Sequence, residues 1–216
     1  MLAGVELGGT KCICTLGMGP DDVRAQAEIP TTNPHATLAA IRDILDGWDF
    51  QALGIASFGP LQLDRTSARF GSIISTPKAG WSGTDLTALA RGGAVAIDTD
   101  VNGAALAEGL WGAAQDVESW AYITVGTGVG VGSICCRQIL RGAGHSEAGH
   151  QRVPKLPCDL FEGTCVYHGD CVEGLASGPA IAARAGKPAR DIASDDEIWG
   201  HVAHALAMLC HNLVLT

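Results

Sequence analysis

Cysteines and histidines with the spacing of metal ligands gather between Gly144 and Glu173. Cys165, His168 and Cys171 follow one another at intervals of three, and His150 lies fifteen residues upstream. Thiolates and imidazoles are the ligands of tetrahedral structural zinc sites, and nearby glycines allow the chain to turn sharply around one ion. Four protein ligands leave no position open for a substrate. The spacing therefore predicts a closed, structural zinc site.

A plainer interpretation treats these cysteines as small buried hydrophobic residues and the histidines as surface residues. We favour zinc, because the surrounding loop is polar and rich in glycine and has few large apolar residues to hold it together without a metal. Glu147 and Glu173 each lie within three residues of a predicted ligand. A loop fixed by a metal would orient both carboxylates for hydrogen bonds to a polyol.

The run E-A-G-H, followed by C-x-x-H-x-x-C-x-E, resembles the signature of the ROK family of repressors, open reading frames and sugar kinases. The common family pattern is C-x-C-G-x-x-G-C-x-E, and the variant present here is similar to that of the bacterial ROK fructokinases. The resemblance implies that zinc binds to the four ligands named above. It also implies a sugar pocket lined by Glu147, His150 and Glu173.

The composition supports a folded framework for such a site. The chain has 216 residues, of which 47% are hydrophobic and 17% charged, which indicates a globular protein of one large or two small domains. A net charge of −9 argues against nucleic acid or an anionic membrane as a partner, because both attract basic surfaces. The eight cysteines lie in a long chain without a basic leader, which favours a reducing cytoplasm. The run nearest to a membrane helix, residues 120–136, is broken by glycines.

Two apolar runs, residues 2–7 and 12–16, read as strands joined by a tight turn. A simple hairpin is one interpretation. The other is a phosphate-binding turn, in which glycines allow close approach of the backbone and a threonine and a lysine supply a hydroxyl and a cation. The spacing and the missing helix exclude a Walker A loop. ROK kinases have a phosphate-binding turn at this position, which implies ATP binding by Gly8, Gly9, Thr10 and Lys11.

A second glycine-rich turn follows the strand predicted over residues 120–125. A hairpin is again the plainer interpretation, but the segment also matches the G-T-G-x-G phosphate loop of the family, which implies ATP binding by Gly126, Thr127 and Gly128. Two phosphate turns on separate hairpins imply two lobes that face one nucleotide. We expect an N-terminal α/β lobe over residues 1–118 and a partial C-terminal lobe with the zinc loop over residues 119–216.

Acids stand where the strand predicted over residues 94–98 leads into a helix that runs to Leu110. Acids at such a junction are commonly helix caps, yet ligands also bind at the carboxyl ends of strands in open α/β sheets. The run D-T-D-V-N resembles the N-D-x-N element of the family, with Thr99 in place of the first Asn. The resemblance implies that Asp100 is the catalytic base and that Asn102 contacts the sugar.

Two further segments complete the first lobe. A helix begins at Asn33 and Pro34 and ends at Gly47 by capping signals, and a strand follows over residues 52–57. The loop S-T-P-K-A-G-W, residues 75–81, resembles that of the fructokinases, in which it lies at the sugar cleft. This resemblance implies that Lys78 binds the substrate.

Together the motifs predict the actin-like, ribonuclease-H-like α/β fold of two-lobed sugar kinases. The resemblance implies phosphoryl transfer from ATP, with Mg²⁺, to a hexose, and fructose 6-phosphate as the product. A glucokinase or mannokinase activity is the alternative within the family. The partners implied are a hexose and ATP, in a cytoplasmic homodimer that binds no nucleic acid or membrane.

The C-terminal segment reads as a helix that starts with a capping box over residues 194–197 and carries an apolar stripe to Thr216 without a terminator. ROK kinases continue beyond this point, so we expect a fragment or a degenerate kinase. A truncated, non-catalytic, zinc-stabilised sugar-binding protein is therefore a second alternative. A repressor is disfavoured, because the first strand begins close to Met1 and leaves no room for a helix-turn-helix.

Overall fold

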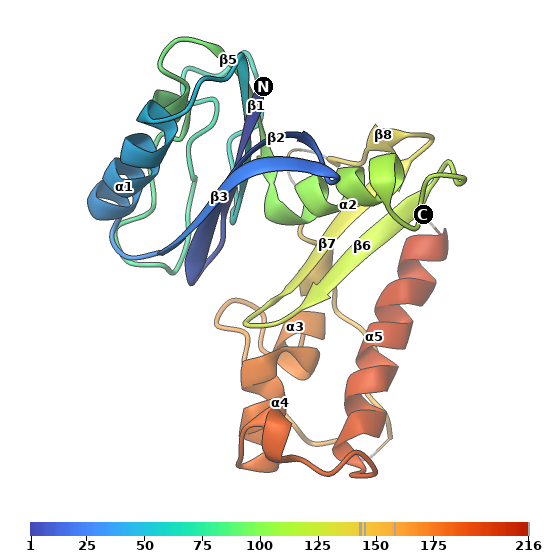
Figure 1. Cartoon of the computed structure of the whole chain (residues 1–216). Helices are drawn as coiled ribbons and strands as arrows, with labels where there is room; N and C mark the ends of the chain where they lie inside the picture. Colours follow the sequence, from blue (N-terminus) through green and yellow to red (C-terminus); the bar gives the residue numbers. More distant parts are fainter. Residues whose placement is uncertain (143, 145, 158, 216) are drawn as a thin grey trace. The chain divides into compact units, whose positions relative to one another are not determined.

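Strands and helices are interspersed along the first part of the chain and helices follow in the last part, which gives a mixed α/β protein (Figure 1). The computed structural model describes residues 1–142, 144, 146–157 and 159–215. The elements are β1 (Leu2–Leu7), β2 (Lys11–Gly19), β3 (Asp22–Pro30), α1 (Pro34–Asp46), β4 (Ala52–Ser57), the 3-10 helix η1 (Thr87–Ala90), β5 (Ala94–Thr99), α2 (Asp100–Trp111), β6 (Trp120–Val125), β7 (Val129–Cys135), β8 (Gln138–Ile139), η2 (Ala148–His150), α3 (Val172–Ala176), α4 (Gly178–Ala185), η3 (Ala189–Asp191) and α5 (Ile198–Leu215).

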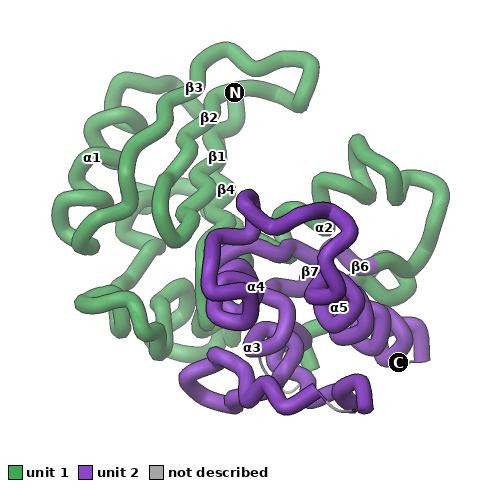
Figure 2. The backbone as a smooth tube through the Cα atoms, turned by 90° about the horizontal axis from the view of Figure 1, so that it is seen from below, with its two compact units in different colours: residues 1–120, 134–145 green, residues 121–133, 146–216 purple. Residues whose placement is uncertain are grey.

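The chain separates into two compact units (Figure 2). Unit 1 comprises Met1–Trp120 and Ile134–His145, and unit 2 comprises Ala121–Ser133 and Ser146–Thr216. Neither unit is one continuous segment, because strand β7 begins in unit 2 and ends in unit 1. The division into lobes at residues 118 and 119 stays a prediction about the family fold.

Unit 1 is built on a five-stranded sheet with the order β3-β2-β1-β4-β5. Strands β1, β2 and β3 are antiparallel neighbours, whereas β4 and β5 run parallel to β1. Alternate residues of β1 (Ala3, Val5 and Leu7) are buried on the face that packs against α1. The predicted helix is confirmed, since Asn33 caps α1 by accepting a hydrogen bond from the Ala36 amide at 2.9 Å.

Helix α2 packs near the carboxyl ends of β4 and β5, on the opposite face of the sheet from α1 (Figure 1). The approach is close, because a methyl group added at Gly103 would lie 2.9 Å from the Cβ atom of Ala56. The helix is capped by Thr99, whose side chain accepts a hydrogen bond from the Asn102 amide. Neither Asp98 nor Asp100 is therefore the N-cap, although both were candidates for that role.

Unit 2 has a smaller apolar core, in which α5 packs against α3 and α4. The predicted apolar stripe of α5 is found: Ile198, Val202 and Leu209 are buried, and Leu206 and Leu213 are partly buried against the same core.

The predicted capping box of α5 is wrong. The helix starts at Ile198, whose amide donates a hydrogen bond to the carboxylate of Asp196 at 3.1 Å. Several neighbouring polar residues offered a cap, and in the structure Asp196 accepts the hydrogen bond. Helix α5 is described as far as Leu215, and Thr216 lies outside the described residues.

A buried ion pair ties the loop between His150 and Cys165 to α4. Asp159 and Arg184 form two hydrogen bonds, of 2.7 and 3.1 Å, and their side chains are only 6% and 12% exposed. The guanidinium group also stacks on the ring of Phe161 at 4.3 Å, and His201 lies 3.1 Å from the same carboxylate. Arg184 holds the pKa of Asp159 down to about 2, even though burial opposes ionisation. Unit 2 therefore depends on paired charge as well as on apolar packing.

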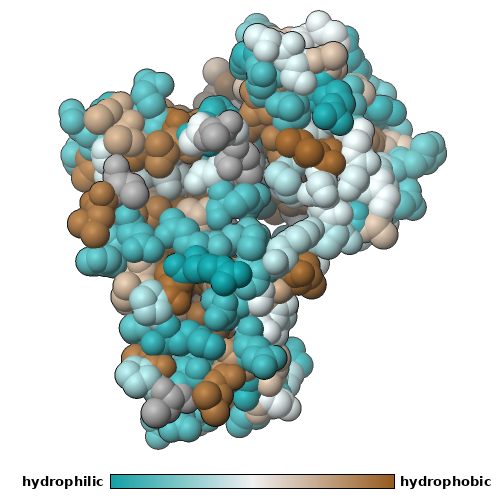
Figure 3. All heavy atoms as spheres, turned by 180° about the vertical axis from the view of Figure 1, so that it is seen from behind, coloured by the Kyte–Doolittle hydropathy of each residue, from teal (hydrophilic) through white to brown (hydrophobic). Residues whose placement is uncertain are grey.

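Helix α5 is also long and apolar enough to cross a membrane, by length and composition alone. It nevertheless packs its stripe into the core of unit 2. The run Trp120–Cys136, which came nearest to a membrane helix in the sequence, instead forms strands β6 and β7 and the turns beside them. On the face drawn in Figure 3, the hydrophobic residues among those described lie in separate groups between hydrophilic ones.

Candidate functional site

The first glycine turn joins β1 to β2 as predicted, and hydrogen bonds from other segments hold its backbone. The Gly8 amide donates to the Lys11 carbonyl at 3.0 Å, and the Thr31 hydroxyl donates to the Gly8 carbonyl at 2.8 Å. A methyl group at Gly8 would lie 2.8 Å from the Lys11 carbonyl oxygen, so this position requires glycine. Gly9 is exposed, and a methyl group there would meet nothing within 4 Å. The tip of the turn is thus rigid and open to a ligand.

Lys11, predicted to bind ATP, and Lys78, predicted to bind the sugar, have different partners. The Lys11 ammonium bonds to the Glu28 carboxylate at 2.7 Å, on the solvent-exposed side of the hairpin, and this contact raises the pKa of Lys11. The Lys78 ammonium, from the loop predicted to bind the sugar, instead donates to the Gly9 carbonyl at 2.6 Å. The cation at the tip of this turn is therefore Lys78.

The second glycine turn, Gly126–Gly128, lies in unit 2 between β6 and β7 as predicted. The Gly178 amide, at the start of α4, donates to the Gly126 carbonyl at 2.8 Å. The Val129 amide donates to Oε2 of Glu173 at 3.1 Å. A methyl group at Gly128 would lie 2.5 Å from that oxygen, so the glycine lets the carboxylate approach the turn. Glu173 thus contacts a predicted ATP loop.

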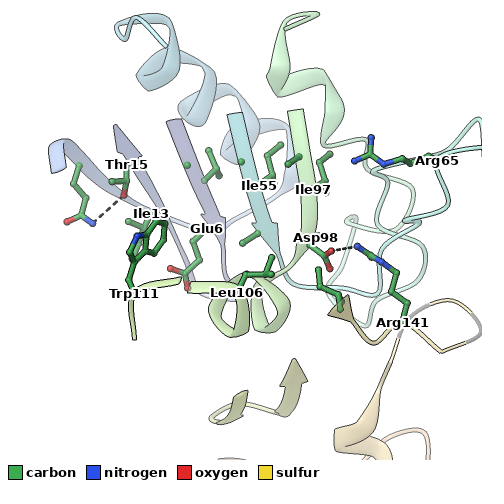
Figure 4. A pocket seen from close by; sticks show the side chains of 18 residues that line it. Glu6, Ile13, Thr15, Ile55, Arg65, Ile97, Asp98, Leu106, Trp111 and Arg141 are labelled. Atoms are coloured by element: carbon green, nitrogen blue, oxygen red, sulfur yellow. Dashed lines mark hydrogen bonds and ion pairs between the residues drawn. The ribbon is translucent and has the colours of Figure 1, made fainter. Parts of the chain in front are cut away.

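Asp98 organises the junction between β5 and α2, and the sequence alone did not identify this role. Its Oδ1 accepts hydrogen bonds from the Thr99 amide at 2.9 Å and from the Asn102 side chain at 2.7 Å. Its Oδ2 accepts from Arg141 at 2.6 Å, as Figure 4 shows. Asp98 is buried, so these three donors stabilise its charge. Asn102, predicted to contact the sugar, is also buried and is held by this carboxylate.

Asp100, the predicted base, lies in the first turn of α2 and is half-buried. Its Oδ1 accepts a hydrogen bond from the Val101 amide at 2.9 Å. Because Thr99 supplies the cap, the carboxylate is not needed to start the helix.

A pocket of about 660 Å³ lies in unit 1, on the face of the sheet that carries α2 (Figure 4). Much of its lining is apolar, with Ile13 from the sheet and Leu106 and Trp111 from α2. Glu6 and Asp98 contribute carboxylates at the same face. Asp100 and Asn102 are not among the lining residues, so neither the predicted base nor the predicted sugar contact lies in this pocket.

The four predicted zinc ligands come together in unit 2. Their ligand atoms lie within 4.8 Å of one another, from His150, Cys165, His168 and Cys171. The Nδ1 atom of His150 lies 3.6 Å from the sulfur of Cys165 and 3.5 Å from that of Cys171, and the Cys165 sulfur lies 3.8 Å from Nδ1 of His168. Tetrahedral zinc with ordinary bond lengths places a sulfur and a nitrogen ligand about 3.6 Å apart. The donor set and its spacing therefore fit a zinc ion.

The chemistry of the cluster also favours a cation. Burial, as the largest cause, raises the pKa of the Cys171 thiol to about 11, with contributions from Cys165 and from Glu173. Two thiols held this close to a carboxylate need a positive charge to ionise together. Zinc would supply that charge and displace the thiol protons.

Two acids predicted for the sugar pocket flank this cluster. Glu147 is exposed and directly precedes η2, and Gly149 packs so tightly on the Val129 carbonyl that no side chain fits there. Oε1 of Glu173 lies 3.9 Å from Nδ1 of His150. Unit 1 thus holds the first turn, Lys78, Asp100 and Asn102, while unit 2 holds the second turn, the four-ligand cluster, Glu147 and Glu173.

Two bacterial fructokinases are similar to this chain over most of its length. The chain is 45% identical over 195 residues to the fructokinase of Zymomonas mobilis, which covers 85% of this chain and 64% of that protein. It is 39% identical over 218 residues to the fructokinase of Pediococcus pentosaceus, which covers 100% of this chain and 76% of that protein.

A solved structure has the same architecture. The ROK hexokinase of Thermus thermophilus matches with a TM-score of 0.75 at 27% identity, over 99% of this chain and 77% of that chain. This likeness confirms the predicted actin-like, ribonuclease-H-like α/β fold of sugar kinases. The ROK family itself matches residues 2–208. The chain therefore belongs to the ROK family.

Proposed function

We propose that this protein transfers the γ-phosphoryl group of ATP to fructose and releases fructose 6-phosphate. The observation that carries the proposal is the chain's identity to fructokinases, 39% over 218 residues in one and 45% over 195 residues in the other. A glucokinase or mannokinase activity is the alternative within the family. The protein would act in the cytoplasm as a homodimer.

Phosphoryl transfer has a loose transition state, so positioning and charge stabilisation supply most of the catalysis. We assign the backbone of the two glycine turns to the phosphates of ATP, with Gly9 open to an approaching oxygen. Mg²⁺ would accompany ATP and neutralise part of its charge. The turns themselves contribute amide groups and a fixed backbone.

Asp100 would accept the proton of the attacking sugar hydroxyl. A capping role does not compete with this function, because the Thr99 side chain already caps α2. Asp98 would act as a positioning residue, since its bonds to Asn102 and Arg141 fix the start of the helix that carries the base. A positioned base contributes about 10²- to 10⁴-fold to the rate.

Zinc would be structural, held by the four ligands of the cluster. Glu173 lies two residues after Cys171 and contacts the second glycine turn, so a fixed cluster would also fix this carboxylate. By their resemblance to the family motifs, His150, Glu147, Glu173 and Asn102 would each contact the sugar. Lys78 would serve the phosphoryl end of the site rather than the sugar, since its ammonium reaches the first glycine turn.

A coupled assay of ADP release with ATP, Mg²⁺ and a panel of hexoses tests this function. We expect fructose to be preferred, and a tenfold preference for glucose or an N-acetylated hexosamine would contradict the proposal. Asp100→Asn should lower turnover by about 10²-fold or more without lowering the unfolding temperature. Retention of more than about a tenth of the activity would exclude Asp100 as the base. Fructose binding without turnover in the unaltered chain would favour a non-catalytic sugar-binding protein.

A further inference from the structure

Two adjacent cysteines lie at the turn between β7 and β8, away from the metal-ligand cluster. Cys135 is the last residue of β7, and Cys136 follows it in the turn. Both side chains are exposed, and their sulfur atoms are 4.0 Å apart. Both residues belong to unit 1. The proposed kinase function uses neither of them.

The backbone of the turn brings the two thiols together. Successive side chains of an extended strand point to opposite faces, so neighbouring cysteines in a strand would keep their sulfurs apart. Here Cys136 and Arg137 have φ angles of 49° and 61°, while Cys135 pairs with Gln138 across the hairpin. Two left-handed residues in a two-residue hairpin loop are usually Asn and Gly.

Contacts from a neighbouring segment maintain this unfavourable turn. A left-handed conformation is unfavourable for a residue other than glycine, because its Cβ atom comes too close to the following carbonyl oxygen. The Cys136 amide donates to the Ser119 hydroxyl at 3.0 Å, and the Arg137 amide donates to the Glu118 carbonyl at 2.8 Å. The backbone that carries the two thiols is therefore held by bonds to a segment outside the turn.

The other described cysteines have different surroundings. Cys12 and Cys14 are buried in the core of unit 1, and Cys165 and Cys171 belong to the metal-ligand cluster. Cys210 is exposed on α5, in unit 2. Among the residues that the structure describes, Cys135 and Cys136 are thus the cysteines that are both adjacent and exposed.

We infer that Cys135 and Cys136 form a dithiol site that chelates a soft, thiophilic centre such as a trivalent arsenical. Thiolates select soft ions over hard ones, and two of them on one rigid turn bind as a bidentate ligand. A disulfide fits this position poorly, because adjacent Cα atoms lie about 3.8 Å apart, below the usual range for a disulfide. A larger bridging atom spans the two sulfurs without that constraint.

The state of the thiols agrees with this chemistry. Cys135 raises the pKa of the Cys136 thiol through a hydrogen bond and through charge repulsion. With an arsenical of the R–As=O class, two S–H bonds and the As=O bond break, two As–S bonds form, and one water leaves. Arsenic stays trivalent, and the reaction needs no oxidant or reductant.

The test probe is phenylarsine oxide, added to the full chain and followed by intact mass and peptide mapping. We expect one adduct on the peptide that contains residues 135 and 136, stable to a monothiol and removed by a dithiol. Cys135→Ser and Cys136→Ser should each abolish this adduct, whereas the matched control Cys210→Ser should retain it. Adduct retained on that peptide in either variant, or its loss to a monothiol, would overturn the proposal.

A second variant separates loss of the thiol from loss of the turn. Cys136→Asn removes the sulfur but favours the left-handed conformation, because Asn tolerates a positive φ. We expect this variant to keep or raise the unfolding temperature and to lose the adduct. Bidentate adduct formation by Cys136→Asn at the level of the unaltered chain would contradict the assignment.

Discussion

The turns at Gly8–Lys11 and Gly126–Gly128 have similar residues but different supports. In the first, a hydroxyl and the Lys78 ammonium bond to the turn carbonyls, and the hairpin belongs to a sheet with a large apolar core. In the second, the Gly178 amide bonds to the turn, and the Glu173 carboxylate lies against it. The comparison shows that glycines supply only the backbone freedom. The partners decide which charge each turn presents.

The largest expected difference between the units follows from removal of the metal. Chelation, or the substitution Cys171→Ser, should lower the stability of unit 2 more than any other change considered, because metal binding contributes directly to folding and the cluster closes a loop with few apolar contacts. Hydrogen exchange resolved by segment would report it, with protection lost over residues 146–176 and kept over β1–β5. Cys210→Ser is the control and should change little. Less than about a tenth of an equivalent of zinc after metal-replete expression would contradict a zinc cluster.

The next largest effect concerns the Asp159–Arg184 pair of unit 2, in which both side chains are buried. Asp159→Asn should destabilise this unit by about 3 kcal/mol, because it leaves Arg184 buried with a neutral partner. Asp46→Asn is the matched control, since Asp46 pairs with Arg91 on the surface and should cost less than about 1 kcal/mol. Denaturant unfolding followed by far-ultraviolet circular dichroism would measure both. Equal effects of the two substitutions would remove the distinction.

The same pair predicts a dependence on pH. The pKa of Asp159 is about 2 in the folded chain, below its usual value of 3.8, so its contribution to stability is present above pH 4 and is lost as the pH falls from about 4 to about 2. Asp159→Asn should lack this part of the acid-induced loss. The unfolding free energy of the two proteins, measured as the pH is lowered, would show this difference. Parallel curves would refute the link between Asp159 and the loss of stability in acid.

The two lysines near the first turn provide a kinetic comparison. Lys78→Met should lower kcat/KM for ATP by about tenfold or more, with little change in fructose binding, because it removes the cation at the turn. Lys11→Met should have a much smaller effect, since Lys11 is paired with Glu28 in solvent. An increase in KM for fructose alone in Lys78→Met would indicate that Lys78 binds the sugar instead.

The smallest expected effect is a difference in stability between substitutions of two glycines, one in each turn. Gly128→Ala should cost about 1 kcal/mol, because the new methyl group displaces Glu173 and breaks its bond to the Val129 amide. Gly9→Ala should leave stability nearly unchanged, because space is available around it. Thermal unfolding of the two variants would test this difference. A larger loss in Gly9→Ala would mean that the first turn is the tighter one.

The sequence predicted the elements whose signals are local. Apolar runs bounded by glycines gave β1, β4 and β6, a capping Asn and an ending Gly gave α1, and regular spacing gave the four ligands that the structure brings together. The contacts that complete the sites are long-range. Arg141 meets Asp98 across 43 positions, and Lys78 meets Gly9 across 69, so no spacing rule could pair them. The start of α5 was missed because several polar residues offered a cap.

The division of unit 1 into two segments has a consequence for synthesis of the chain. Asp98 leaves the ribosome well before Arg141, which lies 43 residues later and beyond the whole hairpin turn of unit 2. At translation rates of about 5 to 20 residues per second, the buried carboxylate waits roughly 2 to 9 seconds for its cation. The nascent unit 1 must therefore keep the carboxylate at the start of α2 hydrated during this interval. Asp98 is paired with Arg141 only after the first strands of unit 2 have been made.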